Sequence, residues 1–399
     1  MPDISVPYLR ENVQCGILCS EFHSGKQRTQ SMSQVLIINP ILYTSETNRI
    51  PKVESIKDTM IYALCMGFVK AGQKVTLIAA QDYQPIAEEQ YDFPVIWMKT
   101  MLRDIFQPRC LPYMPQLRGY LKKHPEYDCI ISSEIFATWS YTAARIYPNK
   151  TIVWHELAKH NNMLHRVPSR IWYNLIARFL MRSVTVVPRS KAAADFIRHF
   201  SDKVSETIID HGVDTDKLMP VQENDKKNRF VVVSQLIGRK RIDKIIDSFA
   251  EFYNMGYSEY SLYIIGRGEL EVELKAQVKR LGLEEAVIFC GQLTHEELLP
   301  IVAQSKALLV ATEKDNNMVS IVESIAVGTP VITTSVPYNA HYIRQYKLGV
   351  VEDGWDGHTL ERICEDNGTY RANCVNYRDK LSNVYCAGQF MSVKGIPLK

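Results

Sequence analysis

Residues 309–333 read LVATEKDNNMVSIVESIAVGTPVIT, and the pattern of this stretch recurs through the chain. Apolar runs at its two ends predict buried strands, and the apolar residues between them follow a helical period. Asn316 or Asn317 is suited to cap the start of that helix, and Gly328 to take the left-handed conformation at its end. The stretch therefore predicts a strand at 307–310, a loop at 313–317, a helix at 318–327 and a strand at 331–333.

Glu323 stands in the middle of the predicted helix, whose other residues leave almost no polar face. A buried carboxylate needs strong hydrogen-bond donors, because burying an unpaired charge is costly or forces protonation. Two kinds of partner fit: a cationic side chain in a structural ion pair, or the two neighbouring hydroxyls of a ribose. Asp315 precedes the same helix, whose free N–H groups and positive dipole end favour an anionic ligand.

Short β-branched runs alternate with helical segments from residue 35 onward, which is typical of parallel sheets covered by helices on both faces. Strands are predicted at 35–39, 75–79, 95–98, 129–132, 151–154, 185–187 and 207–209, and then at 230–234, 262–265, 287–290, 307–310, 331–333 and 350–351. Helices are predicted at 56–70, 116–123, 137–146, 170–181 and 191–199, and then at 242–253, 270–281, 295–303, 318–327 and 360–364.

The 399 residues are enough for two domains of ordinary size. Residues 1–33 have no steady period and are expected to form a poorly ordered leader. Residues 220–228 predict a linker between an N-terminal acceptor-side domain, 34–219, and a C-terminal nucleotide-sugar domain, 229–399, whose last helix is a candidate for return to the first domain. The prediction is an α/β chain with two doubly wound, Rossmann-like domains facing a central cleft, where ligands of such sheets bind.

Composition bounds the class of protein. With 46% apolar and 23% charged residues the chain is expected to be globular. No apolar run approaches the roughly 18 to 20 residues that span a bilayer, and the first residues lack the order of a signal peptide, so a cytoplasmic location is expected. Nine cysteines without metal-type clustering fit a reducing compartment and predict no metal site.

Charge is distributed unevenly along the chain. Residues 1–200 hold 24 Lys and Arg against 16 Asp and Glu, a net of +8, whereas residues 201–399 hold 23 against 28, a net of −5. Between residues 166 and 182, arginines alternate with large apolar residues. This mixture indicates either a solvated helix face or peripheral docking to anionic lipid headgroups on the inner face of the plasma membrane. Nucleic acid is not an expected partner, since no nucleic-acid module accompanies the charge.

Asp315-x7-Glu323, followed by Ser-Ile-Ala-Val-Gly-Thr-Pro-Val-Ile, resembles the carboxylate-x7-glutamate signature of the retaining GT-B glycosyltransferases of family 4, also called glycosyl transferases group 1. The resemblance implies that Asp315 lies against the donor sugar and that Glu323 holds the ribose. It further implies that the loop residues Asn316, Asn317, Met318 and Val319 approach the sugar and phosphate. The sequence departs from the signature in having Asp315 in place of Glu and an Asn-Asn-Met loop in place of a Gly-Phe-Gly type.

Three consecutive cations follow the predicted strand at 230–234, in the segment Gln235-Leu-Ile-Gly-Arg239-Lys240-Arg241. Beside the start of a helix they indicate a diphosphate site or solvated surface charge. The family pattern has an Arg and, five residues later, a Lys that bind the donor diphosphate. Lys240 matches the Lys, but Gln235 occupies the Arg position, so Arg239 is expected to supply the missing charge.

Three further positions resemble the family pattern. Gly266 lies in a Gly-x-Gly turn after a predicted strand, and Gly291 follows the strand that pairs with the nucleobase in the family. His155 comes directly after a buried strand, at a carboxyl edge and therefore in the expected cleft, like a family histidine that contacts the donor sugar. A structural role for His155 is the alternative.

The resemblance implies retaining transfer of a hexose from a UDP- or GDP-linked donor to a saccharide or lipid-linked acceptor, in cell-envelope or capsular polysaccharide synthesis. Cations at Arg239 and Lys240 would stabilise the leaving diphosphate, so no divalent metal or other cofactor is expected. Two alternatives share the architecture: a nucleotide-sugar epimerase, and a catalytically inactive nucleotide-sugar-binding protein.

Overall fold

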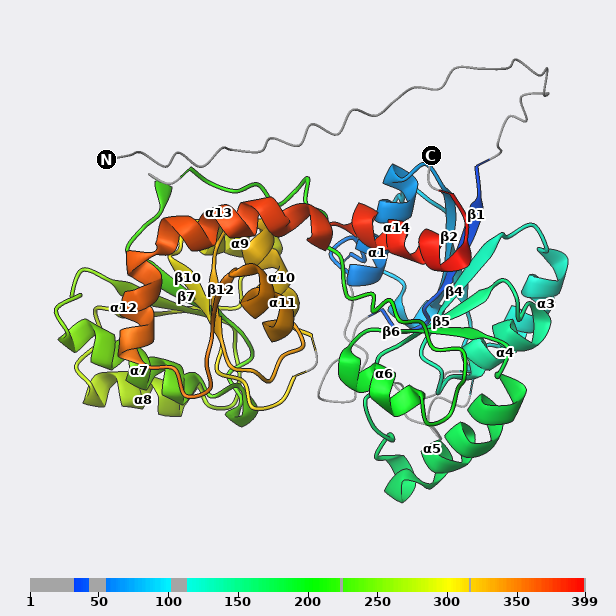
Figure 1. The fold of residues 1–399 in the computed structure, drawn as a ribbon, viewed down its shortest axis with the longest axis horizontal. Coiled ribbons are helices and arrows are strands. Elements are labelled where there is room, and N and C mark those ends of the chain that lie inside the picture. The colour runs from blue at the N-terminus through cyan, green and yellow to red at the C-terminus, as the bar shows by residue number, and fades with distance from the viewer. Residues whose placement is uncertain (1–31, 43–54, 102–112, 223–224, 316, 398–399) are drawn as a thin grey trace, which may run out of the picture. The chain divides into compact units, whose positions relative to one another are not determined.

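The computed structural model describes residues 32–42, 55–101, 113–222, 225–315 and 317–397. Two six-stranded parallel sheets organise this part of the chain, each with helices on both faces (Figure 1). The expected leader at 1–33 falls almost wholly outside the described residues. The predicted α/β class with two doubly wound sheets is confirmed.

The first sheet has the strand order β3-β2-β1-β4-β5-β6. Its strands are β1 (Gln34–Ile38), β2 (Lys74–Ala80), β3 (Val95–Met98), β4 (Cys129–Ser133), β5 (Thr151–His155) and β6 (Thr185–Pro188). Its helices are α1 (Met60–Lys70), α3 (Pro115–Lys123), α4 (Thr138–Ile146), α5 (Val167–Ile171), the π-helical η3 (Trp172–Leu180) and α6 (Lys191–Ile197).

The second sheet has the order β12-β11-β10-β7-β8-β9. Its strands are β7 (Arg229–Val233), β8 (Ser261–Ile265), β9 (Val287–Gly291), β10 (Ala307–Leu309), β11 (Val331–Thr333) and β12 (Gly349–Val351). The helices that follow them are α7 (Ile242–Asn254), α8 (Glu271–Arg280), α9 (His295–Ala303), α10 (Val319–Ala326), α11 (Ala340–Tyr346), α12 (Gly357–Glu365), α13 (Asn367–Tyr377) and α14 (Asn383–Lys394).

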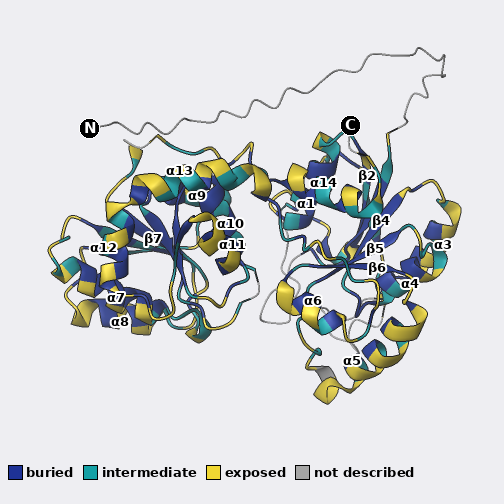
Figure 2. Cartoon of the chain, viewed as in Figure 1, coloured by how far each residue is buried: buried dark blue, intermediate teal, exposed yellow. Residues whose placement is uncertain are grey.

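Alternate side chains of each strand enter different cores, because successive side chains point to opposite faces of a sheet. In β7, Phe230 and Val232 pack with α7, α8 and α12, whereas Val231 packs with α9, α10 and α11. The strands are therefore buried on both faces, and Figure 2 shows them dark blue beneath helices with exposed outer sides. This double burial explains the near-continuous apolar runs from which the strands were predicted.

The C-terminal helix α14 packs on the first sheet's helix α1 although the two are distant in sequence. Phe390 lies in the same core as Phe68, and the Asn383 side-chain amide donates to the Ala63 carbonyl over 2.9 Å. Gly67 gives α14 room, because a Cβ at this position would clash with the Asn383 backbone. The end of the chain thus contributes to the core of the sheet that its beginning forms.

The strand predictions hold except at 207–209. Ile209 is fully buried and donates one backbone hydrogen bond to the Pro188 carbonyl, but no ladder follows. The apolar run at 207–209 reflects the burial of Ile209 and not the pairing of a strand with the sheet. The helix predicted at 170–181 is observed as α5 followed by the wider η3, and the helix predicted from 56 begins at Met60, where Thr59 caps it.

Candidate functional site

The residues predicted to bind the diphosphate lie where the strand order of the second sheet reverses. From β7 the chain moves to β8 and β9 on one side, and β10 returns to pair with β7 on the other. Ligands of doubly wound sheets bind outside the carboxyl ends of strands at such a switch point. Arg239 and Lys240 follow β7 in the turn Gly238–Lys240, and Asp315 follows β10.

Asp315 binds both cations. One carboxylate oxygen is 3.0 Å from Arg239 Nη1 and the other is 2.8 Å from Lys240 Nζ. Thr312 donates its hydroxyl to Asp315 over 2.6 Å, and the Arg239 backbone carbonyl accepts the Glu313 N–H. Side-chain exposure is 33% for Arg239, 11% for Lys240 and 16% for Asp315, so an anionic ligand can reach the cluster from the surface. The structure therefore brings three of the four predicted catalytic residues together.

Electrostatics keep Asp315 ionised. Burial alone would raise the pKa of its carboxyl, but hydrogen bonds from Lys240 and Thr312, with the charges of Lys240 and Arg239, hold that pKa below its ordinary value. In this structure the Asp315 carboxylate is bound to the two cations that a diphosphate would need. A ligand phosphate would have to share or replace these contacts.

The two predicted glycines lie side by side at the ends of β8 and β9. The Gly266 N–H donates to the Gly291 carbonyl over 2.8 Å, and both residues have positive φ, +135° and +68°. A Cβ on Gly266 would clash with the Ser234 carbonyl oxygen, so the close approach of this turn to the loop after β7 requires glycine there. Gln235, in the loop after β7, is exposed.

The loop before α10 is anchored differently from the prediction. Asn317 does not cap the helix: Met318 is at the N-cap position, and its side chain makes no capping hydrogen bond. Instead the Met318 N–H donates to Asn339 Oδ1 over 2.7 Å, and the Asn317 amide donates to the Arg189 carbonyl over 2.9 Å. The prediction was wrong because long-range partners outcompete the local cap, a choice that tertiary packing makes. Asn316 lies outside the described residues.

Glu323 has found a protein partner, His295, the first residue of α9. Its Oε1 accepts a hydrogen bond from His295 Nε2 over 2.7 Å. The hydrogen bond to Glu323 raises the pKa of His295 against the effect of burial, and Asp58 adds to the rise. Both residues line a small pocket of about 90 Å³, with Val319 and residues of the segment leading into α1. Sequence reasoning missed His295, because nothing local links it to Glu323.

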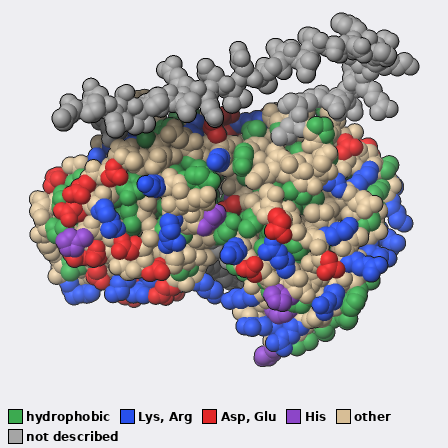
Figure 3. Space-filling view, in the orientation of Figure 1, with side chains coloured by type: hydrophobic (Ala, Val, Ile, Leu, Met, Phe, Trp, Pro, Cys, Tyr) green, Lys and Arg blue, Asp and Glu red, His purple; other side chains and the backbone are tan. Residues whose placement is uncertain are grey.

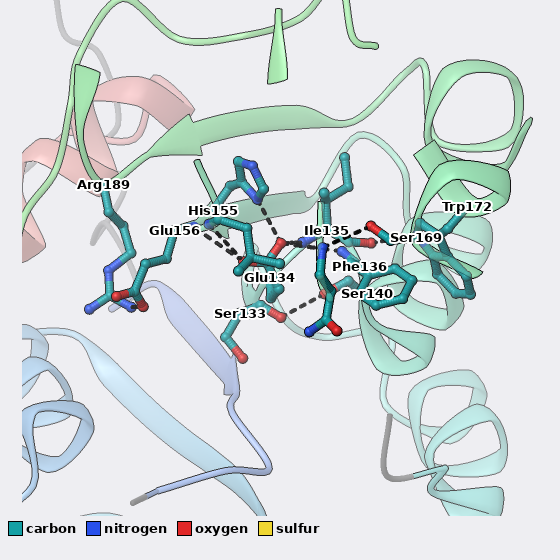
Figure 4. A network of polar contacts seen from close by, with 12 residues as sticks. Ser133, Glu134, Ile135, Phe136, Ser140, His155, Glu156, Ser169, Trp172 and Arg189 are labelled. Carbon is teal, nitrogen blue, oxygen red and sulfur yellow. Dashed lines mark hydrogen bonds and ion pairs between the residues drawn. The ribbon is translucent and has the colours of Figure 1, made fainter. Parts of the chain in front are cut away.

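His155 ends β5 as predicted, but its side chain does not line an open cleft. It is fully buried, and its Nδ1 donates to Glu134 Oε1 over 2.6 Å (Figure 4). Tyr173 and Phe196 lie beside the ring and cover it. The prediction placed the residue at the correct strand end and failed on exposure, since it could not include the aromatic side chains that fold over it. Its Nε2 is buried with no hydrogen-bond partner among the described residues.

Glu134, which follows β4, organises this part of the first sheet and was missed by sequence reasoning. Its carboxylate also accepts backbone N–H bonds, from Ile135 and Phe136 on one side and from Glu156 and Leu157 on the other (Figure 4). Burial would raise its pKa, but His155 and these N–H groups keep the pKa lowered. The backbone of Glu134 is left-handed, with φ +63°. A charged residue directly after a buried strand was the available signal.

Arg189, after β6, forms a second cluster that the sequence did not reveal. Its guanidinium pairs with Glu156 at 2.7 Å, stacks 4.2 Å from the Trp154 ring centroid and donates to His211. Burial and the Arg189 charge lower the pKa of His211. Because the Arg189 carbonyl also accepts the Asn317 amide, this cluster is connected to the loop that carries Asp315.

A second, larger pocket lies beside the Asp315 cluster. It holds about 570 Å³ and is lined by side chains of α7 and of the loops after β10, β11 and β12, including Arg241, Thr312 and Glu313. Arg241 pairs with Asp243 and Glu313, so this wall carries both charges. Among the described residues, no group of three or more His, Cys, Asp or Glu is arranged to hold a metal ion, and no helix is long and apolar enough to cross a bilayer.

Two family models match the chain. Glycosyltransferase Family 4 matches residues 58–217, and Glycosyl transferases group 1 matches residues 214–366. The first contains the Glu134–His155 pair, and the second contains Arg239, Lys240, Asp315 and Glu323. The two matches meet at the same place in the chain and together span most of it.

Similar proteins include the alpha-monoglucosyldiacylglycerol synthase of Streptococcus pneumoniae R6, 26% identical over 50% of this chain and 47% of that protein. The lipopolysaccharide glucosyltransferase WaaG of Escherichia coli K12 is 24% identical over 60% of this chain and 67% of its own. The chain thus spans about half the length of the first relative.

Among solved structures, Anabaena HepE in complex with UDP has a TM-score of 0.61 at 15% identity, covering 91% of this chain and all of its own. The crystal structure of WaaG has a TM-score of 0.54 at 14% identity, covering 90% of this chain and all of its own. At such identities the likeness concerns the fold. The first half of the chain thus matches the Glycosyltransferase Family 4 model, the second half matches the Glycosyl transferases group 1 model, and the fold is that of the GT-B glycosyltransferases.

Proposed function

We propose that this protein transfers a hexose from a UDP- or GDP-linked donor to a hydroxyl of a saccharide or lipid-linked acceptor, with retention of anomeric configuration. The observation that carries the proposal is the pair of cations, Arg239 and Lys240, at the switch point of the second sheet. Negative charge accumulates on a diphosphate as it leaves a sugar. Fixed cations aimed at that charge are usually the largest catalytic term.

Asp315 has two roles in the proposed reaction. Without ligand it neutralises the two cations and holds them in place. When the diphosphate binds, the cations turn to the phosphate oxygens, and the released carboxylate lies against the donor sugar, as the family signature implies. Two side-chain cations already supply positive charge for the leaving group, so the proposed reaction uses no divalent metal.

Glu323 would hold the ribose, because one carboxylate accepts hydrogen bonds from two neighbouring hydroxyls. Its present partner, His295, would have to give up its hydrogen bond to Glu323 when the ribose binds. The Glu323 side chain is 15% exposed, and it lines the small pocket through which a ligand would reach it. Gly266 and Gly291 would keep the nearby strand ends free of side chains where the nucleoside lies.

The acceptor is proposed from the relatives' names. Streptococcal, enteric and Pseudomonas relatives are named for glycolipid, lipopolysaccharide, O-antigen and rhamnose transfer, which supports a role in assembling cell-envelope polysaccharide. Such acceptors are held at the membrane. A cytoplasmic protein that touches the anionic inner face of the plasma membrane would therefore reach both a soluble donor and its acceptor.

A calorimetric screen of UDP, GDP and ADP tests the donor site first. One of UDP or GDP should bind, and Glu323→Ala should weaken that binding more than Glu297→Ala, a control that removes an exposed carboxylate from the capping box of α9. Binding of no nucleotide, or equal effects of both substitutions, would refute the site.

Turnover separates the proposal from its alternatives. A transferase consumes UDP-glucose or GDP-mannose only when an acceptor is present, an epimerase converts the nucleotide sugar alone, and an inactive binding protein does neither. Retention is read from the proton NMR coupling of the anomeric product: an α-linked donor should yield an α-glycoside. Activity that persists in EDTA would support the metal-independent form, and activity that disappears would exclude it.

A further inference from the structure

The segment from Val167 to Arg182 repeats every fourth residue. Ser169, Tyr173, Ala177 and Met181 are buried, whereas the residues two positions from each of them are exposed. The repeat follows from α5 continuing into η3, whose wider turn is seen where the Met181 N–H donates to the Ile176 carbonyl, five residues back. Each of the four rows along the segment therefore keeps its direction over its whole length.

The row opposite the buried one is apolar. Val167, Ile171, Leu175 and Phe179 are 51%, 54%, 56% and 60% exposed. These residues point away from the core that Tyr173 and Ala177 enter, so packing within the sheet's domain does not account for them. A contiguous row of large exposed side chains on one element indicates a surface that another phase or molecule covers.

An adjacent row is basic. Arg166, Arg170, Arg178 and Arg182 are exposed, and no carboxylate in the described part of the chain lies within ion-pair distance of any of them. The local potential is positive: burial lowers the pKa of His160, and the charges of Arg170 and Arg166 lower it further. Figure 3 shows Lys, Arg and His side chains gathered at the end of the molecule that carries α5, with hydrophobic side chains along its edge.

We propose that this face of α5 and η3, with its apolar row (Val167, Ile171, Leu175, Phe179) and its arginine row (Arg166, Arg170, Arg178, Arg182), docks on an anionic lipid bilayer. Apolar side chains enter the boundary between headgroups and acyl chains, while guanidinium groups beside them bind lipid phosphates. A second copy of this chain would bring its own arginines against these, and nucleic acid offers nothing to an outward apolar row. An anionic bilayer offers an apolar phase to the apolar row and phosphate groups to the arginine row.

Docking is independent of the proposed sugar transfer, although it would give that reaction a membrane-held acceptor. Vesicle binding needs no donor or acceptor. A protein that binds vesicles but transfers no sugar would refute the function alone, and a transferase that ignores vesicles would refute the docking face alone.

Sedimentation with vesicles tests the face, using phosphatidylcholine alone and phosphatidylcholine mixed with phosphatidylglycerol. The wild-type chain should bind the mixed vesicles and lose affinity as salt is added. Replacing Arg170, Arg178 and Arg182 by Gln should weaken binding about a hundredfold, since each basic residue at such a surface contributes roughly a fivefold factor. Replacing Ile171, Leu175 and Phe179 by Ser should weaken it about tenfold or more.

The matched control is Val272→Ser with Leu281→Ser, which removes exposed apolar residues on and beside α8. It should leave vesicle binding unchanged. Circular dichroism verifies that each variant is folded. Three results would overturn the proposal. The first is equal binding to both vesicle types, and the second is an equal loss of binding in the control and the apolar variant. The third is a dimer in solution that becomes monomeric in the apolar variant.

Discussion

Glu134 and Asp315 each follow a strand in the middle of a parallel sheet, and each pairs with nitrogen-bearing side chains at about the same distance. Their surroundings differ. Glu134 binds a fully buried histidine and four backbone N–H groups. Asp315 binds the side chains of two cations, Arg239 and Lys240, which are 33% and 11% exposed. The Glu134 and Asp315 side chains are similarly exposed, 21% and 16%, so the difference lies in their partners. A buried histidine and the backbone fix Glu134 in the fold, whereas side-chain cations can turn from Asp315 to a ligand.

Removing Glu134 should produce the largest effect. Glu134→Ala leaves His155 and the surrounding N–H groups without their acceptor, and breaking a buried pair of this kind costs about 3–5 kcal/mol of unfolding free energy. Urea denaturation measures the loss. Because the folded-state pKa of Glu134 is lowered, its contribution should be present above the ordinary carboxyl pKa of 4.5 and fade as the pH falls through the folded-state value.

The matched control is Glu126→Ala, which breaks a histidine–glutamate pair of similar length, 2.8 Å, that is 40% exposed on both sides. It should cause no measurable loss of stability. Similar losses in both variants would show that burial does not distinguish Glu134.

Lys240→Ala tests the Asp315 side of the comparison by removing one of the two cations. It should leave the fold intact and lower kcat about 100- to 1000-fold, since removing one preformed donor to developing charge has this effect. Steady-state assays with the donor identified by the nucleotide screen measure it. Lys244→Ala, which removes an exposed cation in the first turn of α7, should change kcat less than about twofold. Equal losses would mean that general positive charge, not this position, matters.

Asn339→Ala probes the anchor of the loop beside Asp315. The buried Asn339 side chain accepts the Met318 N–H and donates to the Tyr342 hydroxyl. Its loss leaves both groups unsatisfied and should lower the unfolding free energy by about 1–3 kcal/mol. Asn373→Ala removes a comparable but exposed bond, to the Lys347 carbonyl, and should cost less than about 0.5 kcal/mol in the same urea titration.

The smallest expected effect is a pH dependence of nucleotide affinity. The hydrogen bond to Glu323 raises the pKa of His295, so protonated His295 holds the carboxylate that the ribose needs. Asp58 strengthens this protonation and Lys217 opposes it; Lys57 and Asp214 line the same pocket. Affinity should therefore fall, on the order of tenfold, as the pH drops below the raised pKa.

Calorimetry of the bound nucleotide over this range measures that dependence. His295→Gln keeps a hydrogen-bond donor without a titrating charge and should flatten the profile. An unchanged profile in this variant would show that another group is responsible.

Sequence patterning was sufficient for the strands of both sheets because they are buried on both faces and read as continuous apolar runs. It failed at 207–209, where Ile209 is buried without a pairing strand. It also gave no range for α11, α13 or α14, whose buried residues are spread among polar ones.

The sequence by itself determined the two doubly wound sheets and the place of Arg239, Lys240 and Asp315 at one switch point, because strand periodicity and the loops that follow strands are local properties. Only the tertiary structure decided which side chains are covered and which partner each polar group finds. His155 lies under Tyr173 and Phe196, Glu323 binds His295, and the Met318 N–H binds Asn339. Each of these outcomes depends on side chains from distant segments, and a sequence pattern carries no information about which of them will meet.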